Sequence, residues 1–342
     1  MKFGPVPVGD ALGAVLAHSL TLPAGRLRKG AVLGADDLAL LRAAGIGDVV
    51  VARLDPEDRD EDTAAARLAA ALVPDPGAVG LRLGKAATGR VNIYSTGPGL
   101  ADIAAEKIHA VNRVDPMITL ATVPQWQRMA ERSMVATVKI IAYAVPETAL
   151  QKACAAASGG LALRAMQRRR VALITTEVAG QKAAATETGQ DKGRDAVALR
   201  ITRLGGALVA QTGVAHETAS IAAALDTVAR EISDLGAILL LTGSATSDPQ
   251  DVGPAGLRAA GGQVTRFGMP VDPGNLLFFG DLRGLPVIGL PGCARAPALN
   301  GADWVLERIL CDVPVGHDDI AGMGLGGLLK EIPTRPQPRD PK

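Results

Sequence analysis

From residue 171 onward, short apolar runs alternate with segments of helical spacing, and this alternation constrains the fold more than any other feature. The run AILLLTG has no polar residue between its apolar ones, which is typical of a strand covered on both faces. Strands that alternate with helices of roughly 12 to 18 residues predict an α/β fold with a doubly covered, mostly parallel sheet and right-handed crossovers. The expected strands are VALITT, ALVAQTGV, AILLLTG, QVTRFG, NLLFFG and PVIGL, and ADWVLERILC is the expected closing helix.

The first 165 residues are less regular and predict a smaller, mixed α/β region that precedes this sheet. An Ala-rich helix is expected over 61–72, a strand over 134–145 that ends at Pro146, and a helix or helical link over 148–166. The sequence therefore predicts an N-terminal region at 1–165, a domain at 171–312 and a loosely ordered tail at 313–342, where Pro, Gly and charged residues are frequent.

Composition excludes several classes of partner. The 342 residues carry a formal net charge of +1 and only 2% aromatic residues, so neither a basic field nor stacking rings are present for nucleic acid. No apolar run is long enough to span a membrane, and the N-terminus lacks a signal-peptide pattern, so a cytoplasmic protein is expected. Three cysteines without C-x-x-C spacing indicate reduced thiols rather than a disulfide framework or a zinc site.

Four loops follow strands of the predicted sheet, at the edge where open parallel sheets bind ligands. They are TTEVAGQ, GVAHET, TGSATSDPQD and LPGCAR. In the third, Gly243 allows close backbone approach, while Ser244, Thr246 and Ser247 supply hydroxyl groups. A helix that opens near Asp251 would aim free N–H groups at an anion. This loop therefore predicts a phosphate site.

The sequence leaves two interpretations open for several residues of these loops. Asp251 could cap the helix or hold a divalent cation, and Asp248 could form a turn or lie beside a metal. Cys293 is either a reactive thiol or a small buried side chain, and Arg295 either pairs with a phosphate or covers a neighbouring helix. His216 could be a partial helix cap or an acid or base.

Three motifs resemble a known family in their order and spacing. They are TGQDKGRDAVALRITRLGG, LLTGSATSDPQDVGPAGL and VIGLPGCAR. Together they resemble the molybdopterin-binding domain shared by molybdopterin adenylyltransferases, molybdopterin molybdenumtransferases and gephyrin. The resemblance covers roughly residues 171–312.

This resemblance implies a pocket at the sheet edge for molybdopterin or the molybdenum cofactor, a pyranopterin with a phosphate, sometimes with Mg²⁺ and a nucleotide. It implies Asp251 as a metal ligand, and Asp251 and Glu217 as candidate catalytic residues. The ligand-binding residues that it implies are Asp191, Gly193, Thr242, Gly243, Ser244, Thr246, Ser247, Asp251, Pro291 and Gly292.

The chain departs from the adenylyltransferase pattern in two places. Gly243-Ser244-Ala245-Thr246 stands where those enzymes have Gly-Gly-Thr-Gly, and His216 with Glu217 stands where they have an Asp. Since the missing acidic group would help to hold magnesium, the primary hypothesis is a protein that binds and handles the pterin in cofactor synthesis or delivery. A magnesium-dependent nucleotidyl- or molybdenumtransferase is the alternative, and a scaffold with a decayed pocket is a third hypothesis.

The whole chain also resembles the leading half of longer bacterial proteins, in which a similar N-terminal region contains TGRVN and VATVKIIAYAV. In those proteins a cytidylyltransferase-like half follows. The resemblance implies that a separate cytidylyltransferase or a molybdoenzyme is a partner of this chain. Relatives with this domain often form dimers or trimers, so a homo-oligomer is an open expectation.

Overall fold

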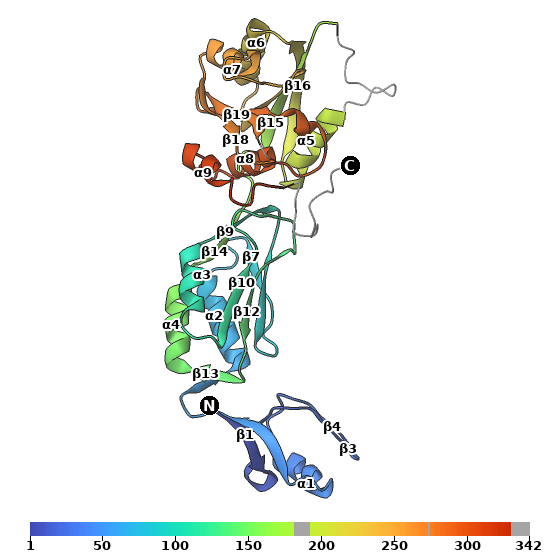
Figure 1. Ribbon diagram of the computed structural model, residues 1–342, viewed down its shortest axis with the longest axis vertical. Helices are drawn as coiled ribbons and strands as arrows, with labels where there is room; N and C mark the ends of the chain where they lie inside the picture. The colour runs from blue at the N-terminus through green and yellow to red at the C-terminus, as the bar shows by residue number, and fades with distance from the viewer. Residues whose placement is uncertain (181–191, 273, 330–342) are drawn as a thin grey trace, which may run out of the picture. The chain divides into compact units, whose positions relative to one another are not determined.

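The computed structural model describes residues 1–180, 192–272 and 274–329 and has a mixed α/β structure with several sheets (Figure 1). The chain divides into two compact units. Unit 1 comprises Met1–Gly97 and Ala101–Leu163, and unit 2 comprises Pro98–Leu100 and the chain from Arg164 onward. Within the described ranges, no helix is both long and apolar enough to cross a membrane.

The first part of unit 1 is a small antiparallel sheet with the strand order β1-β5-β2. Helix α1 begins where the Gly34 N–H donates to Asp37 Oδ2 at 2.9 Å. Leu16, Leu41 and Val51 belong to its apolar core. The elements are β1 (Lys2–Pro7), η1 (Val8–Asp10), β2 (Val15–Leu16), β3 (Leu20–Leu22), β4 (Gly25–Leu27), α1 (Ala35–Ala43) and β5 (Asp48–Arg53).

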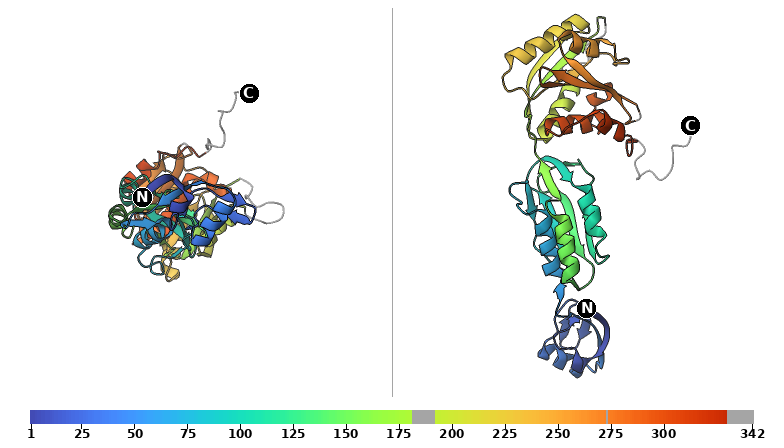
Figure 2. Two further views of the ribbon diagram at one scale, coloured as in Figure 1. Left: turned by 90° about the horizontal axis from the view of Figure 1, so that it is seen from below. Right: turned by 90° about the vertical axis from the view of Figure 1, so that its left-hand side faces the viewer.

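The second part of unit 1 is built on a sheet with the order β10-β12-β8-β7. Helices α2 and α3 pack against this sheet, and α4 packs against both of these helices, with α2 and α4 side by side (Figures 1 and 2). Its core includes Leu68, Ile93 and Leu150, all fully buried. The elements are β6 (Asp58–Asp60), α2 (Glu61–Leu72), β7 (Leu81–Leu83), β8 (Arg90–Ser95), β9 (Gly99–Ile103), α3 (Ala105–Asn112), β10 (Ile118–Thr122), β11 (Arg128–Met129), β12 (Met134–Ile140), β13 (Ala144–Pro146), α4 (Glu147–Ala157) and β14 (Leu161–Arg164).

Two elements of unit 1 differ from the sequence expectation. The strand expected over 134–145 is two strands, β12 and β13, which pair with different sheets. The helix expected over 148–166 ends at Ala157, because Gly159 has a φ of +62° and turns the chain into β14.

Unit 2 contains a six-stranded sheet in the order β16-β15-β17-β20-β19-β18. All five residues of β17 are buried, so both faces of the sheet are covered at that strand. Helices α6 and α7 lie side by side, and Ile221 and Leu225 of α6 share a core with Ile174 of β15 (Figure 1). The elements are β15 (Arg170–Glu177), α5 (Lys192–Arg203), β16 (Ala207–Ala215), α6 (Thr218–Glu231), β17 (Ala237–Leu241), α7 (Val252–Ala259), β18 (Gln263–Met269), β19 (Asn275–Leu282), β20 (Leu285–Leu290), η2 (Gly292–Arg295), α8 (Gly301–Leu310) and α9 (His317–Gly322).

This sheet is mixed: of its five described strand pairings three are parallel and two are antiparallel, so the expectation of a mostly parallel sheet is met only in part. Strand β15 pairs parallel with β16 and β17, and β17 pairs parallel with β20. Strand β19 runs antiparallel to both of its neighbours. Only Arg283 and Gly284 separate β19 from β20, and a two-residue link joins antiparallel strands, because parallel strands need a long crossover.

The segment after residue 312 also differs from the expected loose tail. Within the described part, residues 313–329 include helix α9, and Val313, Ile320 and Met323 are buried. These apolar side chains anchor the segment to unit 2, since their burial removes apolar surface from water.

Candidate functional site

Four loops follow the four mutually parallel strands of unit 2 and therefore lie at one sheet edge. Strand β16 pairs on one side of β15 and β17 on the other, so the strand order reverses at β15. Such a switch point is where open α/β sheets bind ligands. We refer to residues 242–251 as the third loop and to residues 291–300 as the fourth loop.

Hydrogen bonds join three of these loops across the switch point. The N–H of Gly243 donates to Thr176 Oγ1 at 2.8 Å, and the same oxygen lies 2.8 Å from Nδ1 of His216. Thr176 is 4% exposed. A Cβ at Gly243 would lie 2.5 Å from the carbonyl oxygen of Thr176, so the close approach of the two strand ends requires glycine here.

The third loop bonds to itself through hydroxyl groups. Thr242 Oγ1 donates to the carbonyl oxygen of Ser244 at 2.7 Å and lies 3.4 Å from Thr246 Oγ1. Thr242 and Thr246 are both buried, whereas Ser244 and Ala245 are exposed. Among the described residues, the N–H groups of Ser244, Ala245 and Thr246 have no hydrogen-bond acceptor. Successive N–H groups of this kind can receive an anion.

The two aspartates of the third loop hold its backbone. Asp251 caps α7, with Oδ1 accepting from the N–H of Val252 at 2.7 Å and Oδ2 accepting from the N–H of Ser247 at 3.0 Å. Asp248 Oδ1 accepts from the N–H of Gln250 at 2.7 Å. No group of three or more His, Cys, Asp or Glu side chains that could hold a metal ion occurs in the described ranges. The carboxylate of Asp251 thus holds the backbone of the third loop, and no observation supports a Mg²⁺ site.

The fourth loop reaches the third through an arginine. Arg295 Nη2 donates to the carbonyl oxygen of Thr242 at 2.9 Å. Pro291 is buried, whereas Gly292 and Cys293 are exposed. Cys293 is therefore not a small buried side chain, which was one of the two interpretations of this residue. Asn275 Nδ2 lies 3.9 Å from the Cys293 sulfur.

The predicted site residues fall into three groups. Thr242, Gly243, Ser244, Thr246, Ser247 and Asp251 are brought together in the third loop, and Arg295 links Pro291 and Gly292 to them. Gly193 is buried in the first turn of α5, and Asp191 lies outside the described residues. Glu217 is the exposed N-cap of α6 and makes no side-chain cap bond, and no bond within the described ranges joins it to Asp251.

Glu217 borders a cleft of about 700 Å³ at the ends of β15 and β16. The residues that line this cleft are Glu177, Val178, Ala179, Gly180, Gly213, Val214, Ala215, His216 and Glu217. His216 therefore touches both the cleft and, through Thr176, the backbone of the third loop.

Sequence reasoning missed two residues of the site. Thr176 was expected only as part of the loop TTEVAGQ, and Arg200 of α5 was not among the expected site residues. The signal for Arg200 was available, because it follows Ala196 and Val197 on the apolar stripe of its helix at a position where a charged side chain is not expected.

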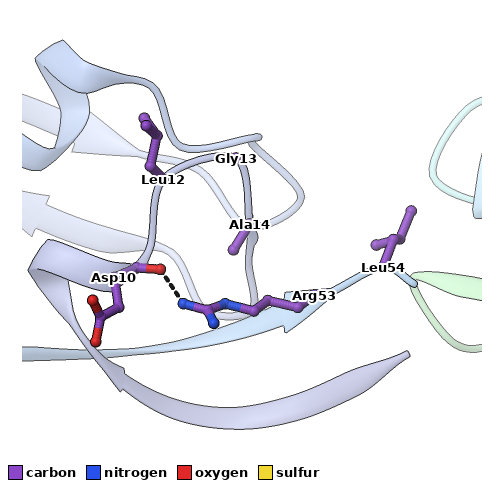
Figure 3. A pocket seen from close by; sticks show the side chains of 6 residues that line it. All are labelled: Asp10, Leu12, Gly13, Ala14, Arg53 and Leu54. Carbon is purple, nitrogen blue, oxygen red and sulfur yellow. Dashed lines mark hydrogen bonds between the residues drawn. The ribbon is translucent and has the colours of Figure 1, made fainter. Parts of the chain in front are cut away.

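A second hollow, of about 460 Å³, lies in unit 1 and is lined by Asp10, Leu12, Gly13, Ala14, Arg53 and Leu54 (Figure 3). Nη2 of Arg53 donates to the carbonyl oxygen of Asp10. Leu12 is 64% exposed and Leu54 is 38% exposed. This hollow has an apolar rim and one guanidinium, without the convergent backbone donors of the third loop.

Comparisons with known proteins give a partial picture. Residues 5–53 match a domain of unknown function (DUF8806). No curated protein matches the chain.

Similar solved structures include three molybdenum cofactor biosynthesis proteins. The molybdopterin biosynthesis MoeA protein of Pyrococcus horikosii is 16% identical, with 90% of this chain and 75% of that one covered and a TM-score of 0.31. Molybdenum cofactor biosynthesis protein B is 16% identical, with 43% and 97% covered and a TM-score of 0.32. A molybdenum cofactor biosynthesis protein of Pyrococcus furiosus is 13% identical, with 94% and 65% covered and a TM-score of 0.24. Identities and TM-scores this low carry no weight for an activity.

Proposed function

We propose that this chain binds molybdopterin or the molybdenum cofactor through its phosphate at the carboxyl edge of the unit 2 sheet, and acts in synthesis or delivery of that cofactor. One observation carries the proposal. The third loop presents the N–H groups of Ser244, Ala245 and Thr246 at the switch point of the sheet, with no acceptor in the described part of the chain.

Arg295 supplies the positive charge that the phosphate requires. One of its nitrogens, Nη2, binds the carbonyl oxygen of Thr242. Its remaining N–H donors have no partner among the described residues and are available to a phosphate oxygen. Backbone donors together with one guanidinium are a common arrangement for phosphate.

The cleft at the ends of β15 and β16 is the proposed place for the fused rings of the pterin. Its volume of about 700 Å³ is within the range of small-molecule sites. The hydrogen bonds from His216 through Thr176 to Gly243 connect this cleft to the phosphate-binding loop. A ligand with a ring system at one end and a phosphate at the other can therefore engage both parts.

Asp251 favours binding over the transferase alternative. A magnesium-dependent nucleotidyl- or molybdenumtransferase would use this carboxylate as a metal ligand, but both of its oxygens accept backbone N–H bonds. Release of pyrophosphate from ATP or CTP in the presence of molybdopterin and Mg²⁺ would overturn this preference.

The proposed function is tested with molybdopterin prepared anaerobically and followed by pterin fluorescence. We expect the protein to bind molybdopterin at least about tenfold more tightly than 6-hydroxymethylpterin, which lacks the phosphate, because a difference of 1.4 kcal/mol is tenfold. Thr246→Ala should weaken molybdopterin binding, since Thr246 supports the loop through Thr242. The matched control is Thr202→Ala, at an exposed position on α5. Equal affinity for the two pterins would contradict the proposal.

A further inference from the structure

We propose that Arg200 of α5 is the positioning residue of this site, which holds the fourth loop so that Arg295 and the Pro291–Cys293 turn face the third loop. The inference rests on the proposed function, because Arg295 is positioned to bind the phosphate of the proposed ligand. Arg200 itself is buried, at 5% exposure, and is not expected to touch the ligand.

All five N–H donors of the Arg200 guanidinium have an acceptor. Nε donates to Asp303 Oδ1 at 2.5 Å. Nη1 donates to the carbonyl oxygens of Ala196 and Ala294, at 3.1 and 3.0 Å. Nη2 donates to the carbonyl oxygens of Ala296 and Ala298, at 2.8 and 3.1 Å. A guanidinium has five N–H donors, so every donor of this buried side chain is hydrogen-bonded.

Three of these five bonds go to the fourth loop, and two of those three go to a stretch without regular structure. Residues 296–300 form neither helix nor strand, so their carbonyl oxygens lack the partners that regular structure would give. Arg200 binds the carbonyl oxygens of Ala294, Ala296 and Ala298, which are alternate residues. The backbone of the fourth loop is thereby fixed to α5 at three successive points.

Asp303 makes the buried charge tolerable and extends the network. Its Oδ1 accepts from Arg200, and its Oδ2 accepts from the N–H of Asn300 at 2.9 Å at the start of α8. Asp303 is 3% exposed, so both charges of the pair are removed from water. Such pairs are stable only when further hydrogen bonds occupy the remaining donors and acceptors, as they do here.

The fixed stretch determines where Arg295 lies. Arg295 stands between Ala294 and Ala296, whose carbonyl oxygens are both held by Arg200. Its own Nη2 donates to the carbonyl oxygen of Thr242 in the third loop. The direct path from α5 to the phosphate-binding loop thus runs through two arginines, one buried and one partly exposed.

The test is Arg200→Lys, which keeps the charge but has three donors instead of five. Arg203→Lys, at an exposed position on the same helix, is the matched control. The first measurement is the rate at which a thiol reagent labels Cys293, located by mass spectrometry, since this exposed thiol reports the order of the fourth loop. The second is the affinity for anaerobically prepared molybdopterin.

We expect Arg200→Lys to raise the Cys293 labelling rate several-fold and to weaken molybdopterin binding about tenfold, which corresponds to the loss of one hydrogen bond to a charged group. Arg203→Lys should match the wild type in both. A folded Arg200→Lys variant with wild-type labelling and affinity would overturn the inference. If Arg200→Lys does not fold, the Arg295→Lys variant tests the inference instead. We expect Arg295→Lys to bind molybdopterin more weakly than the wild type, with the wild-type rate of Cys293 labelling. Unchanged molybdopterin binding in Arg295→Lys would overturn the inference that Arg200 acts through Arg295.

The two proposals fail in different ways. If the wild type does not bind molybdopterin but Arg200→Lys still raises the labelling of Cys293, Arg200 positions the loop and the ligand assignment is wrong. If the wild type binds molybdopterin and Arg200→Lys changes neither measurement, the ligand assignment stands and the positioning role is wrong.

Discussion

Polar groups are used differently at the sheet edge of unit 2 and at the surface of unit 1. At the sheet edge, Thr176 and Arg200 are buried and bind loop backbone. In unit 1, Glu147 of α4 pairs at 2.7 Å with Arg59 of β6 and with Arg67 of α2. The apolar core of this part of unit 1 contains fully buried side chains such as Leu68 and Leu150.

The difference indicates where a binding site is built. Partly exposed ion pairs contribute little to stability, because water screens them and long side chains lose freedom when they pair. Buried polar groups are costly unless they are bonded, so a network of them that holds loops rather than core elements indicates a backbone that must keep one shape. Substitutions at the sheet edge should therefore have larger effects than those at the surface of unit 1.

The largest effect is expected for Gly243→Ala. The added Cβ would lie 2.5 Å from the carbonyl oxygen of Thr176, so the strand end or the loop must move. We expect a loss of about 1–3 kcal/mol in the free energy of unfolding, as for other overpacked sites, together with a loss of molybdopterin binding. Chemical denaturation and pterin fluorescence measure the two effects. Gly322→Ala, on α9 and away from the site, is the control, since nothing lies within 4 Å of a Cβ there, and an equal loss in that variant would remove the comparison.

A somewhat smaller effect is expected for Thr176→Val. The substitution keeps the shape but removes the oxygen that accepts from Gly243 and bonds to His216, and this leaves a partly buried N–H without its partner. An unpaired donor of this kind costs about 1–3 kcal/mol, and we expect a value near 1, with weaker binding of molybdopterin. Thr176→Ser restores the hydroxyl and should recover most of both losses. No recovery with serine would indicate that packing, rather than the hydrogen bond, matters.

The ion pairs of unit 1 should give a smaller, pH-dependent effect. The Arg67 guanidinium bonded to Glu147 lowers the pKa of that carboxyl from 4.5 to about 2. Since the folded-state pKa is the lower one, the stabilisation is present above pH 4.5 and is lost as the pH falls toward 2. Glu147→Gln should reduce the urea midpoint slightly at pH 7 and not at pH 2, and a difference that persists at pH 2 would show that charge is not its cause.

The smallest effect is expected at the hollow of unit 1. Leu12 is 64% exposed, so Leu12→Ser removes little buried apolar surface and should leave the free energy of unfolding within about 0.5 kcal/mol of the wild type. Molybdopterin affinity should also stay unchanged. Weaker binding in Leu12→Ser would place the ligand in this hollow (Figure 3) rather than at the sheet edge.

Part of this structure could be predicted from the sequence. The apolar runs of unit 2 predicted its strands because each run is short, and β15, β16 and β17 are each followed by a helix. The direction of β19 could not be read from composition, since the apolar pattern of NLLFFG suits either direction, and the two-residue link to β20 decides it.

The loops of the site were also predictable, because ligand loops follow parallel strands and their residues are small and polar. The connections between the loops were not. Arg200 is 94, 96 and 98 residues from Ala294, Ala296 and Ala298, and only the fold brings these groups together. The same holds for Thr176 and Gly243, which are separated by 67 residues.

The most direct measurement is an amide NMR titration of the protein with anaerobically prepared molybdopterin. We expect the largest changes in ¹H–¹⁵N chemical shift at Ser244, Ala245 and Thr246, whose N–H groups would donate to the phosphate. Binding that leaves these three amides unperturbed while others shift would contradict the account.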